Sequence, residues 1–316
     1  MTGLVEVVKY SSKDSAAWDA FVKASKNGTF LLYRQYMEYH ADRFEDHSLL
    51  FYRKGKLIAL LPANVVGTEV QSHGGLSYGG IVSGAEMKAQ LMLEVFEAML
   101  QYYSALGFEA VNYKAIPHIY HRQPAEEDLY ALFINKATLY RRDLNTVISL
   151  ADKLPYNTLR KRSLKQAAVV GIEISESQDF ETFSTINQQL LAQKYDVAPV
   201  HTAAELQLLA SRFPENIRLY IATHASEMLA GILVYETATV AHCQYIAATP
   251  QGKELGAPDL LTGYLLTEVY AHKKYFSFGV STEQQGAYLN QNLVQYKESY
   301  GGRTIMHDFY KLPIRK

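Results

Sequence analysis

The sequence has a single cysteine, Cys243, among its 316 residues. One cysteine excludes an internal disulfide framework and a metal site built from several cysteines. The place of Cys243 in a strand-like run predicts a buried apolar residue rather than a nucleophile. The chain also lacks any apolar run near the roughly 20 residues that a membrane-spanning helix needs. Its first residues lack the basic and then apolar pattern of a signal peptide, so we expect a cytoplasmic protein.

An excess of charge of one sign is missing too. The 31 basic and 32 acidic side chains give a net charge of -1, which argues against a surface built mainly for DNA. The hydrophobic content of 48% and charged content of 20% indicate an ordinary globular protein. The chain is longer than a single hydrophobic core usually supports, so we expect two domains.

The histidines show no metal-ligand spacing. His118 and His121 are three residues apart with no acidic companion in register, and His201 and His242 are isolated. We therefore predict no metal site.

The sequence does contain one order of elements that occurs twice, about half a chain apart. Each copy has a hairpin, a strand that ends near a tyrosine, a loop with glycine, an amphipathic helix and a short closing strand. The copies comprise residues 49–61, 76–79, 91–103 and 110–113, and then 219–235, 243–246, 260–272 and 275–278. This order predicts a mixed α/β fold with at least one parallel crossover in each half. We expect domains of residues 1–152 and 153–316.

Hydrophobic periodicity and capping residues predict the remaining elements. One expected helix begins at Asp14 or Ser15. The other expected helices cover residues 30–44, 126–132, 157–167, 180–195, 201–213 and 286–297. The expected strands are residues 137–144, 145–150, 172–174 and 304–312.

A loop of residues 247–259 precedes the second amphipathic helix. A helix N-terminus offers unpaired N–H groups and a partial positive charge, which suit a phosphate. The pattern Lys253-x-x-Gly256-x-Pro258 resembles the pyrophosphate loop of the GNAT N-acyltransferases. That resemblance implies that Lys253, Gly256 and Ala257 bind the donor. An ordinary helix start with proline in its first turn and Asp259 after it explains the same residues.

Three further segments extend the resemblance. They are the basic helix of residues 157–167 followed by Gly171, the strand Tyr275-Phe276-Ser277-Phe278-Gly279, and Tyr296-Lys297-Glu298-Ser299-Tyr300-Gly301. Together they resemble the Fem-type (FemAB-like) branch of the GNAT, or acyl-CoA N-acyltransferase, superfamily. The resemblance is specific mainly from Tyr156 onward, and it implies two GNAT-like domains in tandem.

The resemblance implies catalytic roles for three residues. Lys297 would stabilise the oxyanion formed when an amine attacks a thioester or ester carbonyl. Glu283 would act as general base, and Tyr245 would protonate the leaving group. The alternatives are a lysine that complements a helix dipole, a surface carboxylate and a packing tyrosine.

The same resemblance implies binding residues. Arg160 and Arg162 would contact phosphates of the donor. In the first half, Ser72 to Gly80 is the densest glycine cluster, and His73 and Tyr78 within it would contact the acceptor, although glycines also mark sheet bends. The remaining substrate contacts would be Ser281, Thr282 and Asn290.

We therefore expect an N-acyltransferase that moves an acyl or aminoacyl group from an activated donor to an amine. The first domain would form the acceptor side and the second the donor side. Acyl-CoA is the expected co-substrate, with no tightly bound cofactor. The alternatives are a non-catalytic ligand-binding module on the same scaffold, and a peptidyltransferase of the peptidoglycan-bridge type that uses aminoacyl-tRNA. A tRNA donor is possible but not favoured.

Overall fold

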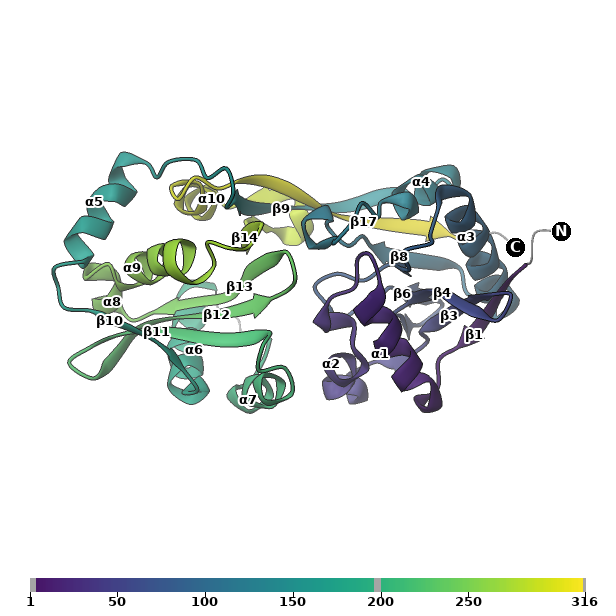
Figure 1. Cartoon of the computed structure of the whole chain (residues 1–316), viewed down its shortest axis with the longest axis horizontal. Helices are drawn as coiled ribbons and strands as arrows, with labels where there is room; N and C mark the ends of the chain where they lie inside the picture. Colours follow the sequence, from purple (N-terminus) through teal and green to yellow (C-terminus); the bar gives the residue numbers. More distant parts are fainter. Residues whose placement is uncertain (1–3, 196–199, 315–316) are drawn as a thin grey trace. The chain divides into compact units, whose positions relative to one another are not determined.

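The computed structural model describes residues 4–195 and 200–314 and has the mixed α/β fold that the sequence predicts (Figure 1). The chain divides into two compact units. The first contains the residues up to Asp143 together with Gln284–Ala287 and those from Met306 onward; the second contains Leu144–Glu283 and Tyr288–Ile305. The predicted boundary between residues 152 and 153 therefore lies further along the chain than this division, and the C-terminal residues lie with the first unit.

The first unit has two groups of strands. One is a sheet in the order β1-β3-β4-β7, and the other runs in the order β8-β6-β5-β2. β6 and β8 are parallel, which confirms the crossover expected in this half. The strands are β1 (Val5–Lys9), β2 (Glu45–Asp46), β3 (Leu49–Arg53), β4 (Lys56–Leu61), β5 (Asn64–Val66), β6 (Glu69–Gln71), β7 (Val82–Ser83) and β8 (Ala110–Lys114).

The helices of the first unit follow the apolar periodicity of the sequence. α1 (Ser15–Ala24) buries Trp18 and Val22. α3 (Ala89–Ala105) buries a stripe from Leu91 to Tyr103 in one core with β3, β4 and β8. The other helices are α2 (Arg34–Met37) and α4 (Glu127–Ile134).

Two predictions in this half are wrong. Residues 30–44 do not form one helix: they form a short 3-10 turn, the four-residue α2 and a further 3-10 stretch. Tyr33 is extended and His40 has non-helical dihedral angles. Residues 76–79 form a loop instead of a strand, and Lys114 Nζ donates to the carbonyl oxygens of His73, Gly74 and Leu76.

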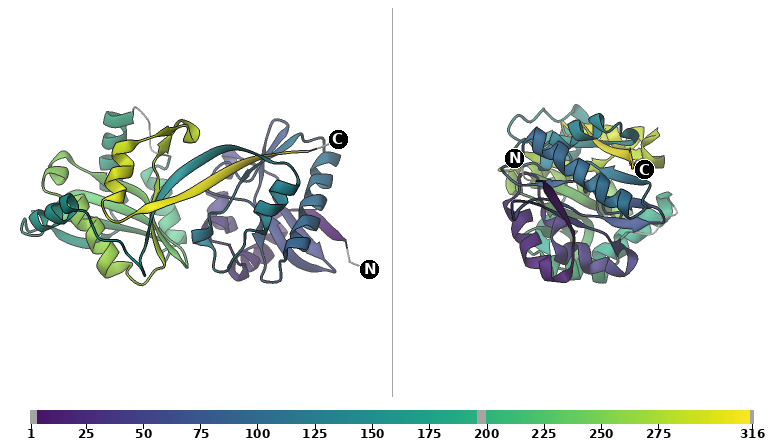
Figure 2. Two further views of the ribbon diagram at one scale, coloured as in Figure 1. Left: turned by 90° about the horizontal axis from the view of Figure 1, so that it is seen from above. Right: turned by 90° about the vertical axis from the view of Figure 1, so that its right-hand side faces the viewer.

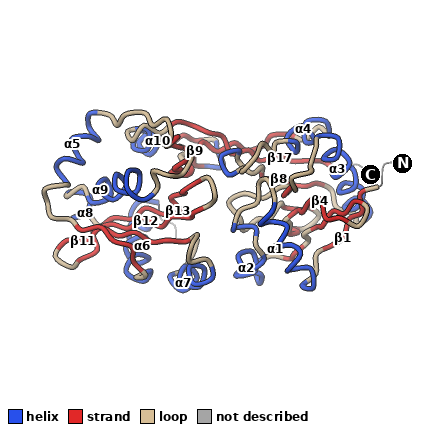
Figure 3. The backbone as a smooth tube through the Cα atoms, in the orientation of Figure 1, coloured by secondary structure: helices blue, strands red, loops and turns tan. Residues whose placement is uncertain are grey.

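The second unit is built on a sheet in the order β10-β11-β12-β13-β14-β9, whose strands are drawn in red in Figure 3. β13 and β14 are parallel, which confirms the second crossover, and the other pairs are antiparallel. The strands are β9 (Thr138–Ser149), β10 (Glu173–Ser177), β11 (Ile217–His224), β12 (Glu227–Glu236), β13 (Val240–Ala248) and β14 (Tyr275–Val280).

Helices cover both faces of this sheet. Successive side chains of a strand point to opposite faces, and on β12 Ala230 and Ile232 join the core with α9 (Ala257–Tyr264). Gly231 between them faces Phe183 of α6 (Phe180–Tyr195). The other helices are α5 (Thr158–Ala167), α7 (Ala203–Arg212), α8 (Pro250–Glu254) and α10 (Gln291–Glu298).

Two helices of this half differ from their predicted ranges. The helix expected over residues 260–272 begins at Ala257 and ends as a π turn, Leu265–Val269. The helix expected over residues 286–297 is preceded by a small hairpin of β15 (Thr282–Glu283) and β16 (Tyr288–Leu289), so that only α10 is helical. The predicted strands 137–144 and 145–150 are the single strand β9.

Two strands carry the chain from one unit to the other. β9 starts in the first unit and ends in the second, and β17 (Arg303–Pro313), the long yellow strand in Figure 2, returns from the second unit to the first. Within the described residues, none of the helices has the length and apolar character needed to cross a membrane.

Gly301 is required by both its conformation and its surroundings. Its φ is +86°, and a Cβ there would lie 2.4 Å from the Leu154 carbonyl oxygen. Gly171, in the same unit, has a φ of +85° and nothing within 4 Å of a Cβ. We expect Gly171→Ala to cost about 1–2 kcal/mol, because only the left-handed backbone is strained. Gly301→Ala adds a steric clash, and we expect a loss above about 3 kcal/mol.

Chemical denaturation of the two variants measures this difference. Equal losses of unfolding free energy would show that the Leu154 carbonyl moves aside and that the contact does not require glycine.

Candidate active site

The parallel strands β13 and β14 diverge within the sheet of the second unit. Their ladder has three residue pairs, which end at His242 and Ser277, although β13 continues to Ala248 and β14 to Val280. Both strands are bulged where they part. β13 shifts register against β12 at Gln244, and β14 shifts against β9 after Ser277. Bulges bend a strand and redirect its groups. We call residues 242–248 with 277–280 the β13–β14 fork.

Lys297 of α10 is anchored to the β14 side of the fork. Its side chain is 4% exposed, and Nζ donates to the carbonyl oxygens of Gly279, at 3.0 Å, and Val280, at 2.6 Å. An ammonium group has three N–H donors, so these two bonds leave one for another acceptor. Burial lowers the pKa of Lys297 to about 8, against a smaller opposing effect of Cys243. Lys297 is therefore largely charged at neutral pH.

Two predicted substrate residues hold the end of β14 in place. The Ser281 N–H donates to the Leu144 carbonyl oxygen at 2.8 Å, and its buried hydroxyl lies 3.5 Å from Thr146 Oγ1. Thr282 Oγ1 accepts the Leu144 N–H at 3.3 Å. Ser281 and Thr282 thus contact β9 and support the chain that follows the fork.

Glu283 and Asn290 form a pair. Glu283 Oε1 accepts from Asn290 Nδ2 at 2.6 Å, and Asn290 Oδ1 accepts the Leu293 N–H as the N-cap of α10. Both side chains are half-buried, so a substrate can reach them. The structure therefore joins Glu283 to the start of α10 through Asn290, while Lys297, in the last turn of that helix, contacts the end of β14.

Tyr245 lies on the β13 side of the fork. Its hydroxyl is 2.6 Å from His201 Nδ1, and burial raises its pKa above the usual value. Tyr245 is therefore protonated at neutral pH and linked to a histidine that the sequence pattern left isolated.

His242 and Ser277 occupy the point where the fork opens. His242 Nδ1 lies 3.0 Å from Ser277 Oγ, which accepts the Gly279 N–H at 3.2 Å. Our sequence reasoning missed both residues, because the pairing of β13 with β14 depends on a long-range register. The sequence feature that could have indicated them is His242 itself, a histidine in a strand that is followed by a helical crossover to a parallel strand.

The first turn of α9 is occupied by the protein's own carboxylate. Asp259 forms an ion pair with Arg160 and accepts from Ser163 at 2.5 Å and from Tyr300 at 2.9 Å. The Arg160 guanidinium also donates to Ser299 and lies over the Tyr300 ring. Arg160 is thus committed to joining α5, α9 and α10, and is not placed to contact a donor phosphate.

The other predicted donor-binding residues surround this turn. Gly256 and Ala257 are buried, and a Cβ on Gly256 would lie 3.1 Å from the Ala167 Cβ. Lys253 and Arg162 are exposed. Of this group, Lys253 and Arg162 have cationic groups that a ligand can reach.

The two predicted acceptor residues of the first unit are buried. His73 has a φ of +60°, and burial lowers its pKa to about 3. The Tyr78 hydroxyl pairs with Thr29 Oγ1 at 2.9 Å, and its ring packs on Tyr120. His73 lines a pocket of about 420 Å³ that also contains the buried Arg34. Tyr78 is not among the lining residues of that pocket.

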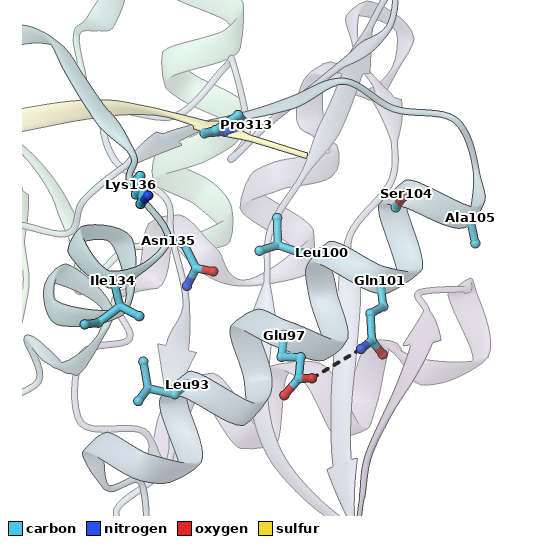
Figure 4. A pocket seen from close by; sticks show the side chains of 10 residues that line it. All are labelled: Leu93, Glu97, Leu100, Gln101, Ser104, Ala105, Ile134, Asn135, Lys136 and Pro313. Carbon is cyan, nitrogen blue, oxygen red and sulfur yellow. Dashed lines mark hydrogen bonds between the residues drawn. The ribbon is translucent and has the colours of Figure 1, made fainter. Parts of the chain in front are cut away.

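A pocket of about 700 Å³ lies on the first unit beside α3 and α4 (Figure 4). None of its lining residues is a predicted site residue; they are Leu93, Glu97, Leu100, Gln101, Ser104, Ala105, Ile134, Asn135, Lys136 and Pro313. Across the part of the chain that the structure describes, no group of three or more His, Cys, Asp or Glu side chains is placed to hold a metal ion.

Comparison with known proteins finds a family model that matches part of the second half of the chain. Residues 156–298 match the sequence model of the acetyltransferase (GNAT) domain. The crystal structure of FemX has a TM-score of 0.69 at 9% identity, with 98% of this chain and 97% of that chain covered. L-PGS from Bacillus licheniformis has a TM-score of 0.63 at 12% identity, covering 98% and 93%. No curated protein sequence matches the chain.

A tandem GNAT protein from the clavulanic acid biosynthesis pathway also shares the fold. Its TM-score is 0.54 at 9% identity, and 99% of each chain is covered. The predicted fold of two GNAT-like domains in tandem is thereby confirmed over nearly the whole chain.

Two arginines of α5 test the role of the Arg160–Asp259 pair. Arg160→Met removes one partner of a buried ion pair, and we expect a loss of about 3 kcal/mol in unfolding free energy, because Asp259 would stay buried without its counterion. Arg162→Met, on the exposed side of the same helix, should change stability by less than about 0.5 kcal/mol. Denaturant titration followed by circular dichroism gives both values. Equal effects would contradict the structural role of Arg160.

Proposed function

We propose that this chain, which carries a GNAT acetyltransferase domain within a tandem GNAT fold, transfers an acyl group from a thioester to an amine. Acyl-CoA is the donor we favour. The arrangement of Lys297 at the β13–β14 fork carries the proposal. It combines strands that part at their carboxyl ends, where ligands of α/β sheets bind, with a buried cation that keeps one N–H unbonded among the residues the structure describes.

The proposed reaction is direct attack. The nitrogen lone pair of the acceptor forms the new C–N bond, and the carbonyl electrons move onto oxygen. The free Lys297 N–H donates to that oxyanion, and its burial strengthens this interaction because little water competes. Collapse of the intermediate breaks the C–S bond and releases a thiolate.

Protons move through two groups in this proposal. Glu283, held by Asn290, takes a proton from the attacking amine, directly or through water. Tyr245 gives a proton to the departing thiolate and recovers one through His201. The raised pKa of Tyr245 keeps the hydroxyl protonated until the thiolate forms.

Exposed cations near the start of α9 support a phosphate-bearing donor. Lys253 and Arg162 are the residues we assign to donor phosphates, and Arg160 is withdrawn from that role because Asp259 neutralises it. Glu283 and Asn290, which are half-buried, are the proposed acceptor contacts that a substrate can reach. His73 and Tyr78 are too buried to serve without a local movement.

Lys297→Met tests the oxyanion role. The loss of one oxyanion donor typically lowers kcat by about 100- to 1000-fold, and we expect a loss of that size in thiol release from acetyl-CoA with a panel of primary amines. Lys273→Met is the control: its Nζ also donates to a backbone carbonyl, that of Thr237, and pairs with Glu236, but it lies just before β14 begins, away from the fork. Lys273→Met should retain kcat within about threefold.

The pH dependence gives a second measurement. The Lys297 ammonium is present below its pKa of about 8, so kcat should fall as the pH rises through 8. Lys297→Arg stays charged to above about pH 12 and should lack this alkaline limb. A folded Lys297→Met protein with full activity would contradict the site assignment.

The donor itself is tested by native mass spectrometry and by melting temperature. A co-purified thioester, or a rise in melting temperature with acetyl-CoA, would support the proposal. No shift with any acyl-CoA well above a plausible dissociation constant would favour a non-catalytic binding module, and activity with aminoacyl-tRNA alone would favour the aminoacyl-transfer alternative.

A further inference from the structure

One face of α5 packs against α9, at the margin of the second unit (Figure 1). The residues of α5 that make these contacts are three or four positions apart and therefore share one side of the helix; they are Arg160, Ser163, Leu164 and Ala167. Their partners at the start of α9 and within it are Asp259, Gly256 and Gly263. These contacts fix which side of α5 points away from the protein.

The side of α5 that points away is exposed and combines cations with aliphatic side chains. Leu159 is 69% exposed, and Val169, in the turn that follows the helix, is 85% exposed. Lys161 and Lys165 are exposed as well. We call these four residues the outer face of α5. Arg162 lies among them, but it is assigned above to donor phosphates and is not counted here.

The outer face of α5 has no acidic residues to neutralise its cations. The sequence contains no Asp or Glu between positions 152 and 173. Within residues 4–195 and 200–314, neither Lys161 nor Lys165 forms an ion pair, whereas the exposed Lys311 of the first unit pairs with Glu69. A chain with a net charge of -1 therefore has a locally positive surface at α5.

The aliphatic side chains decide what kind of anion this surface fits. Cations alone would suit any polyphosphate, but proteins that bind single-stranded nucleic acid stack its bases on aromatic side chains, and the outer face of α5 has none. Leu159 and Val169 would stay in water on such a partner. At a lipid surface they can enter the acyl boundary while lysines contact the headgroup phosphates.

We propose that the outer face of α5 docks the protein on an anionic phospholipid surface. The helix lies along the surface, with Lys161 and Lys165 at the phosphates and Leu159 and Val169 inserted beside them. This contact involves no covalent step and does not depend on the proposed acyl transfer.

Vesicle sedimentation of the full chain tests the charged part of the surface. The wild type should bind vesicles of phosphatidylcholine with about 30% phosphatidylglycerol, and not vesicles of phosphatidylcholine alone, because the lysines need anionic lipid. Lys161→Gln with Lys165→Gln should weaken binding about 25-fold, or about fivefold for each cation. Lys54→Gln with Lys56→Gln removes two exposed lysines from the turn between β3 and β4. This control changes the net charge equally and should stay within about twofold of the wild type.

Leu159→Ser with Val169→Ser tests the apolar part. Both side chains are exposed, so the fold should be retained, as circular dichroism can show. Affinity for the anionic vesicles should fall about tenfold, because the inserted apolar area is lost.

Three results would overturn the proposal. One is an absence of wild-type binding to the anionic vesicles. Another is an equal loss in the two lysine double variants, which would show a general effect of charge. The third is unchanged vesicle binding by the serine variant together with tighter binding of the wild type to polyuridylic acid, which would indicate an RNA surface. None of these measurements requires turnover, so a failure of the proposed acyl transfer would leave them interpretable.

Discussion

The short parallel ladder between β13 and β14 is the constraint on which the candidate site depends. If the strands stayed paired to their ends, the backbone of residues 278–280 would be consumed by hydrogen bonds within the sheet. Because the ladder stops at His242 and Ser277, two carbonyl groups of β14 are free to hold the ammonium of Lys297. The bulges in both strands lie where the two strands part.

Lys114 and Lys297 differ in the number of hydrogen-bond acceptors that each contacts, and this difference distinguishes a structural lysine from a proposed catalytic one. Burial lowers the pKa of Lys114 and of Lys297 to about 8, and each donates to backbone carbonyls of a glycine-containing segment. Lys114 has three such acceptors, which uses all its N–H groups. Lys297 has two. A buried charge is costly unless its donors are satisfied; among the described residues Lys297 keeps one N–H without an acceptor, and the proposed acyl transfer assigns it to the substrate oxygen.

The elements that depend on local sequence patterns could be predicted from the sequence. Periodicity located α1 and α3, and the segment around Lys297 was recognised from its own residues. Residues 30–44 have a helical apolar spacing, but the structure breaks them at Tyr33 and His40 to suit packing that spacing does not encode. The partner of Arg160 is Asp259, which lies far along the chain. The sequence of the basic helix does not show that Arg160 is paired and that its neighbour Arg162 is exposed. The register that pairs His242 with Ser277 likewise depends on residues far apart in the chain.

The return of β17 to the first unit has a consequence for biosynthesis. Residues 309–313 pair with β8, and they emerge from the ribosome after the whole of the second unit. At translation rates of about 5–20 residues per second, the first unit waits roughly 8–30 seconds for the strand that completes it. During that time the unpaired edge of β8 is exposed to other chains. The second unit itself ends only at Ile305, so neither unit has all its strands until β17 has been made.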